Sequence, residues 1–514
     1  MNLNDPARAR EELDRAVGSG SPDAIARAAL SNIWPLYSSH HDALTAAVVG
    51  LPSALLERHP VLKMVHPMTV VLARTTRPFK PLIYQDEARS MSPEEIDLIT
   101  LVQMIAFRSS GDVAAALGYA RRLEDRILQT RVESRDRTDG PLWFYHHQIG
   151  STLLASGDTT RALLEFATAR QLGRFSIQID AERLPFGREA LAHAVRGSLA
   201  DAERALGNAR SKPTPTAAHL HGARTTEATV AALIAVDRMS DDLDDALAAL
   251  DPYDSVELTW PFALLTRARA FLARRQPEDA LEAIHLAADS HPAQHGSFAT
   301  DVIAATSIKA LLAVGDVARA RRIADESTDP GVLTRLATVR VALHDGRYDL
   351  AGHGLTLLSA GEALGPAQRA ETVLLSGWLE LARAGDIDRD TALQISRVAR
   401  KRDNRRLLAI MPRQLVDHVR ALLPTEPAAE FHSVTAGLAN FEMHPRPVLT
   451  MGERRVLNAL SSHQTTAAIA ETFHVSPNTI KSQLQSLYRK LGSSTRDEAI
   501  KTATRFNLLG AEVR

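Results

Sequence analysis

The chain has 514 residues, of which 45% are hydrophobic, 24% are charged and 5% are aromatic. This composition is typical of a folded protein, and the abundance of Ala and Leu over aromatic residues favours helices over sheets. The sequence contains no cysteine, which excludes disulfides, thiolate catalysis and cysteine-ligated metal centres. No apolar run is long enough to span a bilayer, and the N-terminal residues lack the apolar core of a signal peptide. We therefore expect a cytoplasmic protein without a membrane partner.

Charge is distributed unevenly along the chain. The net charge is only −1, which taken alone argues against a nucleic-acid binder. Residues 449–514, however, contain nine Lys or Arg and five Asp or Glu, a net charge of about +4 that leaves about −5 for the remainder. A basic end on an acidic body is typical of a protein that places one small domain on DNA.

A recurring pattern over residues 100–400 predicts a series of helix pairs. An apolar helical stretch ends in Gly or a polar turn, and an Ala-containing helix follows, as in SSGDVAAALGYARRL and LAVGDVARARRIADES. Glycine relieves left-handed strain where a helix ends, and each helix pair leaves an apolar face that only the next pair can cover. The turn positions recur at intervals of roughly 30–50 residues, a period typical of helical solenoids: Gly111, Gly157, Gly197, Pro277, Gly315 and Gly346.

We therefore predict an all-α fold in which residues 1–423 form a helical-repeat region for sensing or oligomerisation. The G-D-x-x-x-A turn motif at Gly111, Gly157 and Gly315 resembles that of tetratricopeptide-like repeats. This resemblance implies a solenoid and says little about a ligand.

Four prolines predict a linker over residues 424–448, because proline interrupts helices. They are Pro424, Pro427, Pro445 and Pro447. We expect one short helix near residues 433–440. The basic run at residues 401–406 is either a solvated helix face or an auxiliary phosphate contact.

Residues 449–514 carry the signals of four short helices. Thr450 and Glu453 form a T-x-x-E capping box that starts the first helix, and a second helix is expected over residues 466–473. The apolar positions that give the first helix its buried stripe are Val456, Leu457 and Leu460. A tight turn over residues 474–476 follows the second helix.

The third helix has the clearest boundaries. Ser476 can cap its free amides, Pro477 fits its first position, and Gly492 ends it. A second capping box, Thr495 with Glu498, starts the last helix. The apolar positions of that helix, expected to complete a small core, are Ala499, Ile500, Ala503 and Phe506.

The third helix separates into two faces at 100° per residue. Its apolar residues, which cluster within about 60° of one another, are Ile480, Leu484, Leu487 and Leu491. The opposite face offers donors suited to base edges and phosphates: Asn478, Lys481, Ser482, Gln485 and Arg489. Two short helices, a tight turn and a capped third helix together predict a helix-turn-helix.

The segment resembles the LuxR-type helix-turn-helix. The family pattern L-T-x-R-E, E-I-A, S-x-x-T-V-K and K-L-G corresponds here to L-T-M-G-E at residues 449–453, A-I-A at 468–470, S-P-N-T-I-K at 476–481 and K-L-G at 490–492. The resemblance implies that Lys481, Ser482 and Gln485 reach into the major groove, and that the last helix pairs two domains in a homodimer on DNA. Gly452 stands where the family usually has Arg, Ala467 belongs to the pair before E-I-A that is usually polar, and Gln483 stands where the family usually has His.

The candidate contacts to double-stranded DNA are therefore Thr466, Asn478, Thr479, Lys481, Ser482, Gln485, Arg489 and Lys490. For Thr466, Thr479 and Lys490 we expect phosphate contact, although each could equally be a cap or a surface residue.

Large LuxR-type regulators provide a second resemblance. Residues 51–74 look like the helix pair that opens their repeat region, which often follows a P-loop ATPase. No G-x-x-x-x-G-K-[ST] sequence occurs here, so we expect no ATPase module.

No motif for catalysis is found. The sequence has no H-E-x-x-H, G-x-S-x-G or dinucleotide-binding glycine pattern, and its paired histidines are poorly placed to share a metal. We expect neither an enzyme nor a metal or other cofactor. Aromatic residues that could line a ligand pocket, but fit a repeat core equally, are Trp143, Phe144, Tyr145, Trp260 and Trp378.

The leading hypothesis is a sequence-specific DNA-binding transcription regulator whose helical repeats sense a small-molecule ligand or a protein partner. The alternative is a helical-repeat interaction scaffold with an accessory DNA-docking domain.

Overall fold

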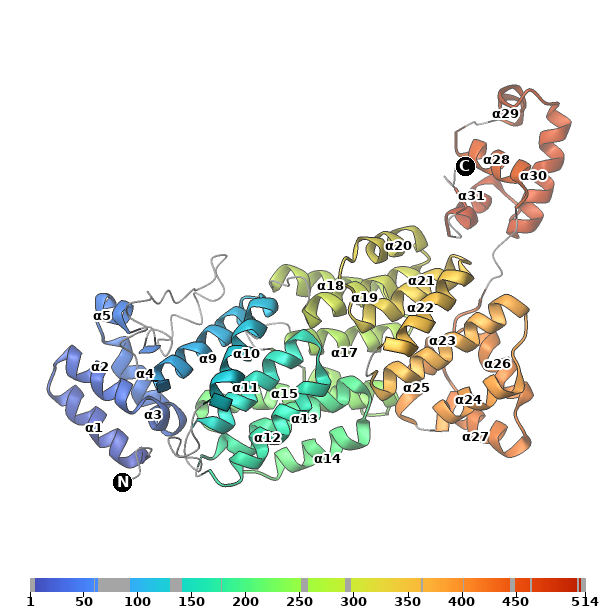
Figure 1. Ribbon diagram of the computed structural model, residues 1–514. Coiled ribbons are helices and arrows are strands. Elements are labelled where there is room, and N and C mark those ends of the chain that lie inside the picture. Colours follow the sequence, from blue (N-terminus) through green and yellow to red (C-terminus); the bar gives the residue numbers. More distant parts are fainter. Residues whose placement is uncertain are drawn as a thin grey trace. The chain divides into compact units, whose positions relative to one another are not determined.

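The computed structural model describes residues 5–59, 61–62, 93–129, 141–176, 178–250, 258–291, 297–361, 364–400, 402–443, 449–462, 465–505 and 508–509. Over these ranges the regular elements are helices, and β-type pairing is limited to one bridge between Pro412 and Phe441. The predicted all-α fold is confirmed. No described helix is both long and apolar enough to cross a membrane. The helices form two compact units, the first mostly before and the second mostly after residue 267 (Figure 1).

The first helices form a small cluster with its own apolar core, which includes Leu13, Leu36 and Leu44. They are α1 (Pro6–Gly18), α2 (Pro22–Ser31), α3 (Ile33–Ser39), α4 (His41–Val49) and α5 (Ser53–Arg58). Within the predicted opening helix pair at residues 51–74, α5 is described, whereas residues 63–74 lie outside the described residues.

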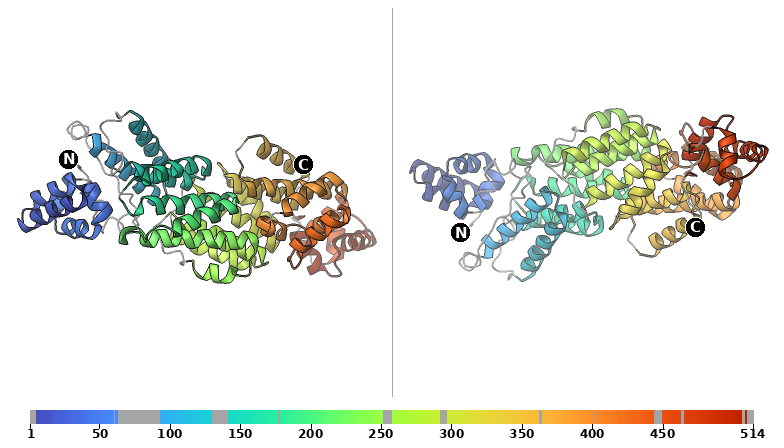
Figure 2. Two further views of the ribbon diagram at one scale, coloured as in Figure 1. Left: turned by 90° about the horizontal axis from the view of Figure 1, so that it is seen from below. Right: turned by 90° about the horizontal axis from the view of Figure 1, so that it is seen from above.

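Consecutive helix pairs follow in the first unit. They are α9 (Pro93–Ser109), α10 (Val113–Gln129), α11 (Leu142–Ser156), α12 (Thr159–Gly173), α13 (Asp180–Arg196), α14 (Leu199–Arg210), α15 (Ala217–Arg238) and α16 (Leu243–Ala248). Each first helix packs on its partner and on the next first helix, as α11 does on α12 and α13. Each second helix also packs on the next pair, as α12 does on α13. This packing order, visible from two further directions in Figure 2, is compatible with a repeat array.

The turns between paired helices follow the glycine prediction. Gly157, which ends α11, has φ of 89°, and Asp158 N–H donates to the Leu153 carbonyl at 3.0 Å. The same left-handed conformation occurs at Gly111, Gly197, Gly315 and Gly346. Arg275, just before Pro277, and Met239, which follows α15, adopt the same conformation without being glycine, with φ of 63° and 49°. The backbone turn is therefore kept where the glycine is not.

The remaining helices before the last domain are α17 (Trp260–Ala273), α18 (Pro277–Ser290), α19 (Phe298–Val314), α20 (Val317–Glu326), α21 (Val332–His344), α22 (Tyr348–Gly361), α23 (Pro366–Ala384), α24 (Arg389–Arg400), the 3-10 helix η2 (Arg402–Asn404), α25 (Arg405–Ala409), α26 (Arg413–Leu422) and α27 (Thr425–Thr435). Helices α21 to α27 of the second unit contribute to one apolar core, which includes Leu374, Trp378, Leu408 and Phe431.

Two segments near the end of this unit differ from their expected structure. The helix expected near residues 433–440 is instead α27, whose Phe431 is buried and which packs on α24, α25 and α26. Pro424 directly precedes this helix and Pro427 lies in its first turn, where proline is tolerated. In the basic run at residues 401–406, Arg406 is buried, so this run is not entirely a solvated helix face. Lys401 lies outside the described residues.

The last four helices are α28 (Met451–Ser462), α29 (Thr466–Thr472), α30 (Pro477–Leu491) and α31 (Arg496–Arg505). Their core is made by residues between 449 and 509 alone, among them Val456, Ile480 and Leu487. These helices therefore have the apolar core of a small domain.

Candidate nucleic-acid interface

The first helix of this domain, α28, begins at the predicted capping box. Thr450 N–H donates to Glu453 Oε2 at 2.7 Å, and Glu453 N–H donates to Thr450 Oγ1 at 3.3 Å. The two residues satisfy each other's backbone amides. Val456, Leu457 and Leu460 are buried, as their spacing predicts.

Glu453 also connects α28 to α30. Ser486 Oγ donates to Glu453 Oε1 at 2.8 Å, and Lys490 Nζ donates to Glu453 Oε2 at 2.7 Å. Burial alone would raise the pKa of Glu453. Hydrogen bonds from Lys490, the Thr450 backbone and Ser486 outweigh that effect and lower the pKa to about 2. The carboxylate therefore fixes the orientation of α30 on α28.

The turn between α29 and α30 is tight. His474 has a positive φ of 54°, and Val475 N–H donates to the Ala470 carbonyl at 3.0 Å. Ser476 Oγ then accepts from Thr479 N–H at 3.2 Å, with Pro477 in the first turn of α30. Gly492 ends α30 with φ of 61°. These short-range features set where α30 starts and stops.

The two faces of α30 separate as predicted. Ile480, Leu487 and Leu491 are buried, and Leu484 packs against the same core. The side chains on the opposite face are all exposed, namely Asn478, Lys481, Ser482, Gln485 and Arg489. An α-helix that projects amide, hydroxyl and cationic groups from a supported base can enter the major groove and donate to base edges.

The three candidate phosphate contacts have different surroundings. Thr479 is exposed, and its hydroxyl lies 2.9 Å from Ser476 Oγ at the helix cap. Thr466 is half-buried at the first position of α29, where Thr465 provides the cap. Lys490 is paired with Glu453 inside the domain, a partner that the sequence does not reveal. Phosphate contact by these three residues stays a prediction.

Two of the departures from the family pattern are neighbours in space. A Cβ atom on Gly452 would lie 3.1 Å from Nε2 of Gln483. The first turn of α28 and the half-buried Gln483 of α30 thus pack closely, and the absence of a side chain at Gly452 leaves room for the Gln483 amide. Ala467 is exposed on α29.

The last helix closes the domain core. The second capping box forms, because Glu498 N–H donates to Thr495 Oγ1 at 3.2 Å and Thr495 N–H donates to Glu498 Oε2 at 3.2 Å. Ala499 and Ala503 are buried and Ile500 packs against the same core, whereas Phe506 lies outside the described residues.

Comparison with known proteins identifies this domain. Residues 447–503 match the family described as bacterial regulatory proteins, luxR family. The C-terminal domain is a LuxR-type helix-turn-helix domain. Its capping box, turn and two-faced α30 are the features on which the sequence resemblance rests.

The curated relatives are similar to a short part of the chain. Two proteins named "Probable transcriptional regulatory protein NarL", from two strains of Mycobacterium tuberculosis, are each 43% identical to this chain over 82 residues. The matched part is 15% of this chain and 38% of each relative. The chain therefore spans well under half the length of these relatives, and most of this chain lies outside the match.

The aromatic candidates of the array have different surroundings. Trp143, Phe144 and Tyr145 are buried in α11, and Trp260 stacks on His291 with ring centroids 4.6 Å apart. Trp378 is buried in α23 and also borders a pocket. Among the described residues, no group of three or more His, Asp or Glu is placed to hold a metal ion.

Proposed function

We propose that this protein is a sequence-specific, DNA-binding transcription regulator. The observation that carries the proposal is the exposed polar face of α30 within a LuxR-type domain. The core behind Ile480 and Leu487, together with the Glu453 bridge to Lys490, supports that face from the other side. A rigidly held helix positions its donors before DNA arrives, which reduces the entropy lost on binding.

In this proposal Lys481, Ser482 and Gln485 contact bases in double-stranded DNA. Asn478 and Arg489 flank them on the same exposed face. Thr466, Thr479 and Lys490 contact phosphates, which would fix the position of the domain on the duplex without reading sequence.

Binding of the full chain to DNA from its own upstream region tests this assignment. Lys481→Ala and Gln485→Ala should each lower specific affinity by about 1–3 kcal/mol if these residues read bases. Arg319→Ala is the control, because it removes an exposed cation from α20, outside the domain. Specific affinity that is unchanged in both domain variants would refute the assignment.

We further propose that the helical array controls the domain by sensing a ligand or a protein partner, and that the protein acts as a homodimer. A bound effector stabilises the folded state by mass action. A thermal-shift screen of metabolites against the full chain would therefore show which compounds bind. Sedimentation with and without operator DNA would show whether two copies assemble on it.

One observation favours the scaffold alternative. Leu350 and Leu357 lie seven residues apart on α22 and are 54% and 59% exposed, so they share one helix face on which an apolar partner could dock. If the array were a scaffold, full-length protein would retain a stable protein partner and show no sequence-selective DNA binding.

A further inference from the structure

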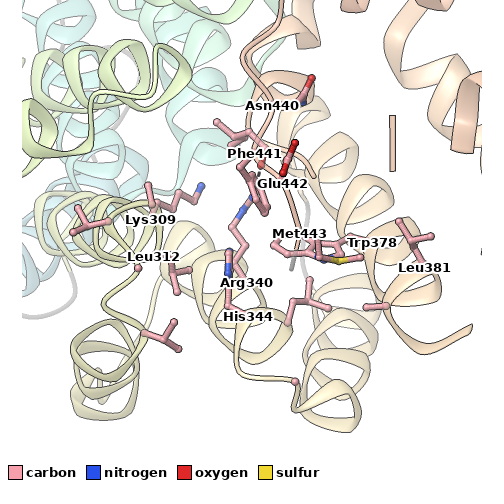
Figure 3. Close-up of a pocket in the computed structure, with 18 of the residues that line it drawn as sticks. Lys309, Leu312, Arg340, His344, Trp378, Leu381, Asn440, Phe441, Glu442 and Met443 are labelled. Carbon is pink, nitrogen blue, oxygen red and sulfur yellow. Dashed lines mark hydrogen bonds between the residues drawn. The ribbon is translucent and has the colours of Figure 1, made fainter. Parts of the chain in front are cut away.

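A pocket in the second unit combines buried positive charge with aromatic side chains. Its lining comes from several helices and from the segment after α27. The lining residues that carry the argument are Arg275, Lys309, Arg340, His344, Trp378 and Phe441. Figure 3 shows Lys309 on one side and Trp378 on the other, with Arg340 and His344 between them.

The charges at the base of the pocket do not balance. Glu371 Oε1 lies 3.1 Å from Lys309 Nζ and 3.0 Å from Arg340 Nη2, and the buried Arg406 also acts electrostatically on this carboxylate. Lys309 and Arg340 therefore share one buried carboxylate, so these three side chains together carry an excess positive charge. Burial, together with Arg340 and Arg406, outweighs the effect of Glu371 and lowers the pKa of Lys309 to about 8.

The other charged groups that line this side of the pocket do not cancel the excess. Arg275 adds an exposed cation and Glu442 an exposed carboxylate, so cations outnumber carboxylates in the lining. Buried charges are costly when they are not compensated. An anionic group placed beside Lys309 and Arg340 would offset that cost.

The side of the pocket that carries the aromatic residues suits a ligand with a flat or apolar group. The His344 and Phe441 rings stack with centroids 5.6 Å apart, and Trp378 meets Phe441 edge-on at 5.4 Å. The Arg275 guanidinium lies over the Phe441 ring at 5.9 Å from its centroid. Leu312 and Met443 also line the pocket. Pockets with mostly apolar walls and a few converging polar groups are typical small-molecule sites.

The segment that carries Phe441 leads towards the LuxR-type domain. Phe441 accepts a hydrogen bond at its carbonyl from Arg413 N–H at 2.8 Å, and Gln414 bonds both the N–H and the carbonyl of Met443 at 2.9 Å. Residues that match the LuxR family begin at position 447. A molecule in the pocket would thus touch the end of the array from which the chain continues to the domain.

We propose that this pocket is the effector site and that it binds a small organic anion with an aromatic body. The anionic group pairs with Lys309 and Arg340, and the body packs on Trp378 and Phe441. The inference rests on the proposed regulator function and adds to it the chemical class and position of the effector.

Calorimetric titration of the full chain tests this site. The probes are phenylacetate and phenyl phosphate, which differ in their anionic group, and the neutral phenylacetamide. Either anion or both should bind saturably at millimolar concentration or below, and the amide should bind at least about tenfold more weakly because it lacks the charge. The anions should also quench the intrinsic tryptophan fluorescence saturably. Loss of this quenching in Trp378→Phe would place the bound anion beside α23.

Two variants and a control separate the pocket from general charge effects. Lys309→Gln should weaken anion binding by about tenfold or more. Arg275→Gln changes an exposed residue of the pocket rim and should weaken anion binding severalfold. This variant keeps the test valid even if Lys309→Gln, which changes a buried residue, does not fold. Arg322→Gln removes an exposed cation on α20 that does not line the pocket, and should leave binding unchanged.

The proposal is overturned if neither anion binds wild-type protein, if the amide binds as tightly as the anions, or if Arg275→Gln and Arg322→Gln behave alike. DNA binding measured on the same preparation keeps the two proposals apart. Selective DNA binding without anion binding overturns the pocket alone. Anion binding without selective DNA binding supports a ligand site and overturns the regulator function.

Discussion

Replacing Glu453 by Gln tests whether one buried carboxylate holds the recognition helix in place. Glutamine keeps the size of the side chain but loses its charge, so Lys490 loses its ion-pair partner. Glu453 is only 5% exposed, and its carboxylate accepts from Thr450 N–H, Ser486 Oγ and Lys490 Nζ at 2.7–2.8 Å. Each hydrogen bond to a charged group contributes about 1.5–3 kcal/mol.

The expected cost is about 2–3 kcal/mol. Full loss of all three hydrogen bonds would cost more, but the glutamine oxygen still accepts one bond and the partly exposed Lys490 gains access to water. The lowered pKa gives a similar figure, because a change from 4.5 to about 2 corresponds to about 3 kcal/mol in favour of the charged form. A domain of this size is stabilised by only about 3–10 kcal/mol in total, so the effect should be large.

The difference between wild type and variant should also depend on pH. The pKa of Glu453 is lower in the folded than in the unfolded domain, so its contribution is fully present above about pH 4.5. That contribution is lost as the pH falls towards 2. The two proteins should therefore converge in stability across this window.

Urea unfolding of residues 444–514, followed by far-ultraviolet circular dichroism, measures these differences. Glu498→Gln is the matched control, because Glu498 has the same place in the second capping box but is exposed; its loss should destabilise the domain clearly less than Glu453→Gln does. Equal costs for the two substitutions, or a Glu453→Gln cost that does not shrink below pH 4.5, would refute the reasoning.

Two further predictions concern the array and can be measured as shifts in its thermal unfolding midpoint. Gly157→Ala should destabilise it by about 1–2 kcal/mol, because φ at this turn is 89° and a left-handed conformation is strained for alanine. Gly118→Ala should instead stabilise it by about 0.5–1 kcal/mol, since Gly118 lies within α10 with nothing within 4 Å of an added Cβ; the same sign for both glycines would contradict this account of the turns. Glu371→Gln should cost about 3–5 kcal/mol because it leaves Lys309, Arg340 and Arg406 without their shared carboxylate, and a neutral result would show that the three cations are solvated.

The sequence was most informative where structure depends on neighbouring residues. The capping boxes, the Ser476-Pro477 start and the Gly492 stop of α30 all act over a few positions, and each forms as predicted. The left-handed turns of the array were equally readable, because glycine marks most of them. At Met239 and Arg275 the glycine is missing, although both residues adopt the same left-handed conformation.

Long-range pairings were not predictable in the same way. Lys490 meets Glu453 across 37 positions, and no periodicity connects two such residues. Lys309, Arg340 and Glu371 come from three separate helices, and each looks like an ordinary polar position in its own helix. The prolines near α27 favoured a linker, yet Phe431 gains enough burial in the core of the second unit for a helix to form beside them.

Selection of DNA from a random duplex pool by the full-length protein tests the central claim most directly. Sequence-specific reading by α30 predicts that wild-type protein enriches a defined motif. The Lys481→Ala/Gln485→Ala double variant should lose preference within that motif while keeping salt-dependent, non-specific binding. Failure of the wild-type protein to enrich any motif, or enrichment of the same motif by the double variant, would contradict the account.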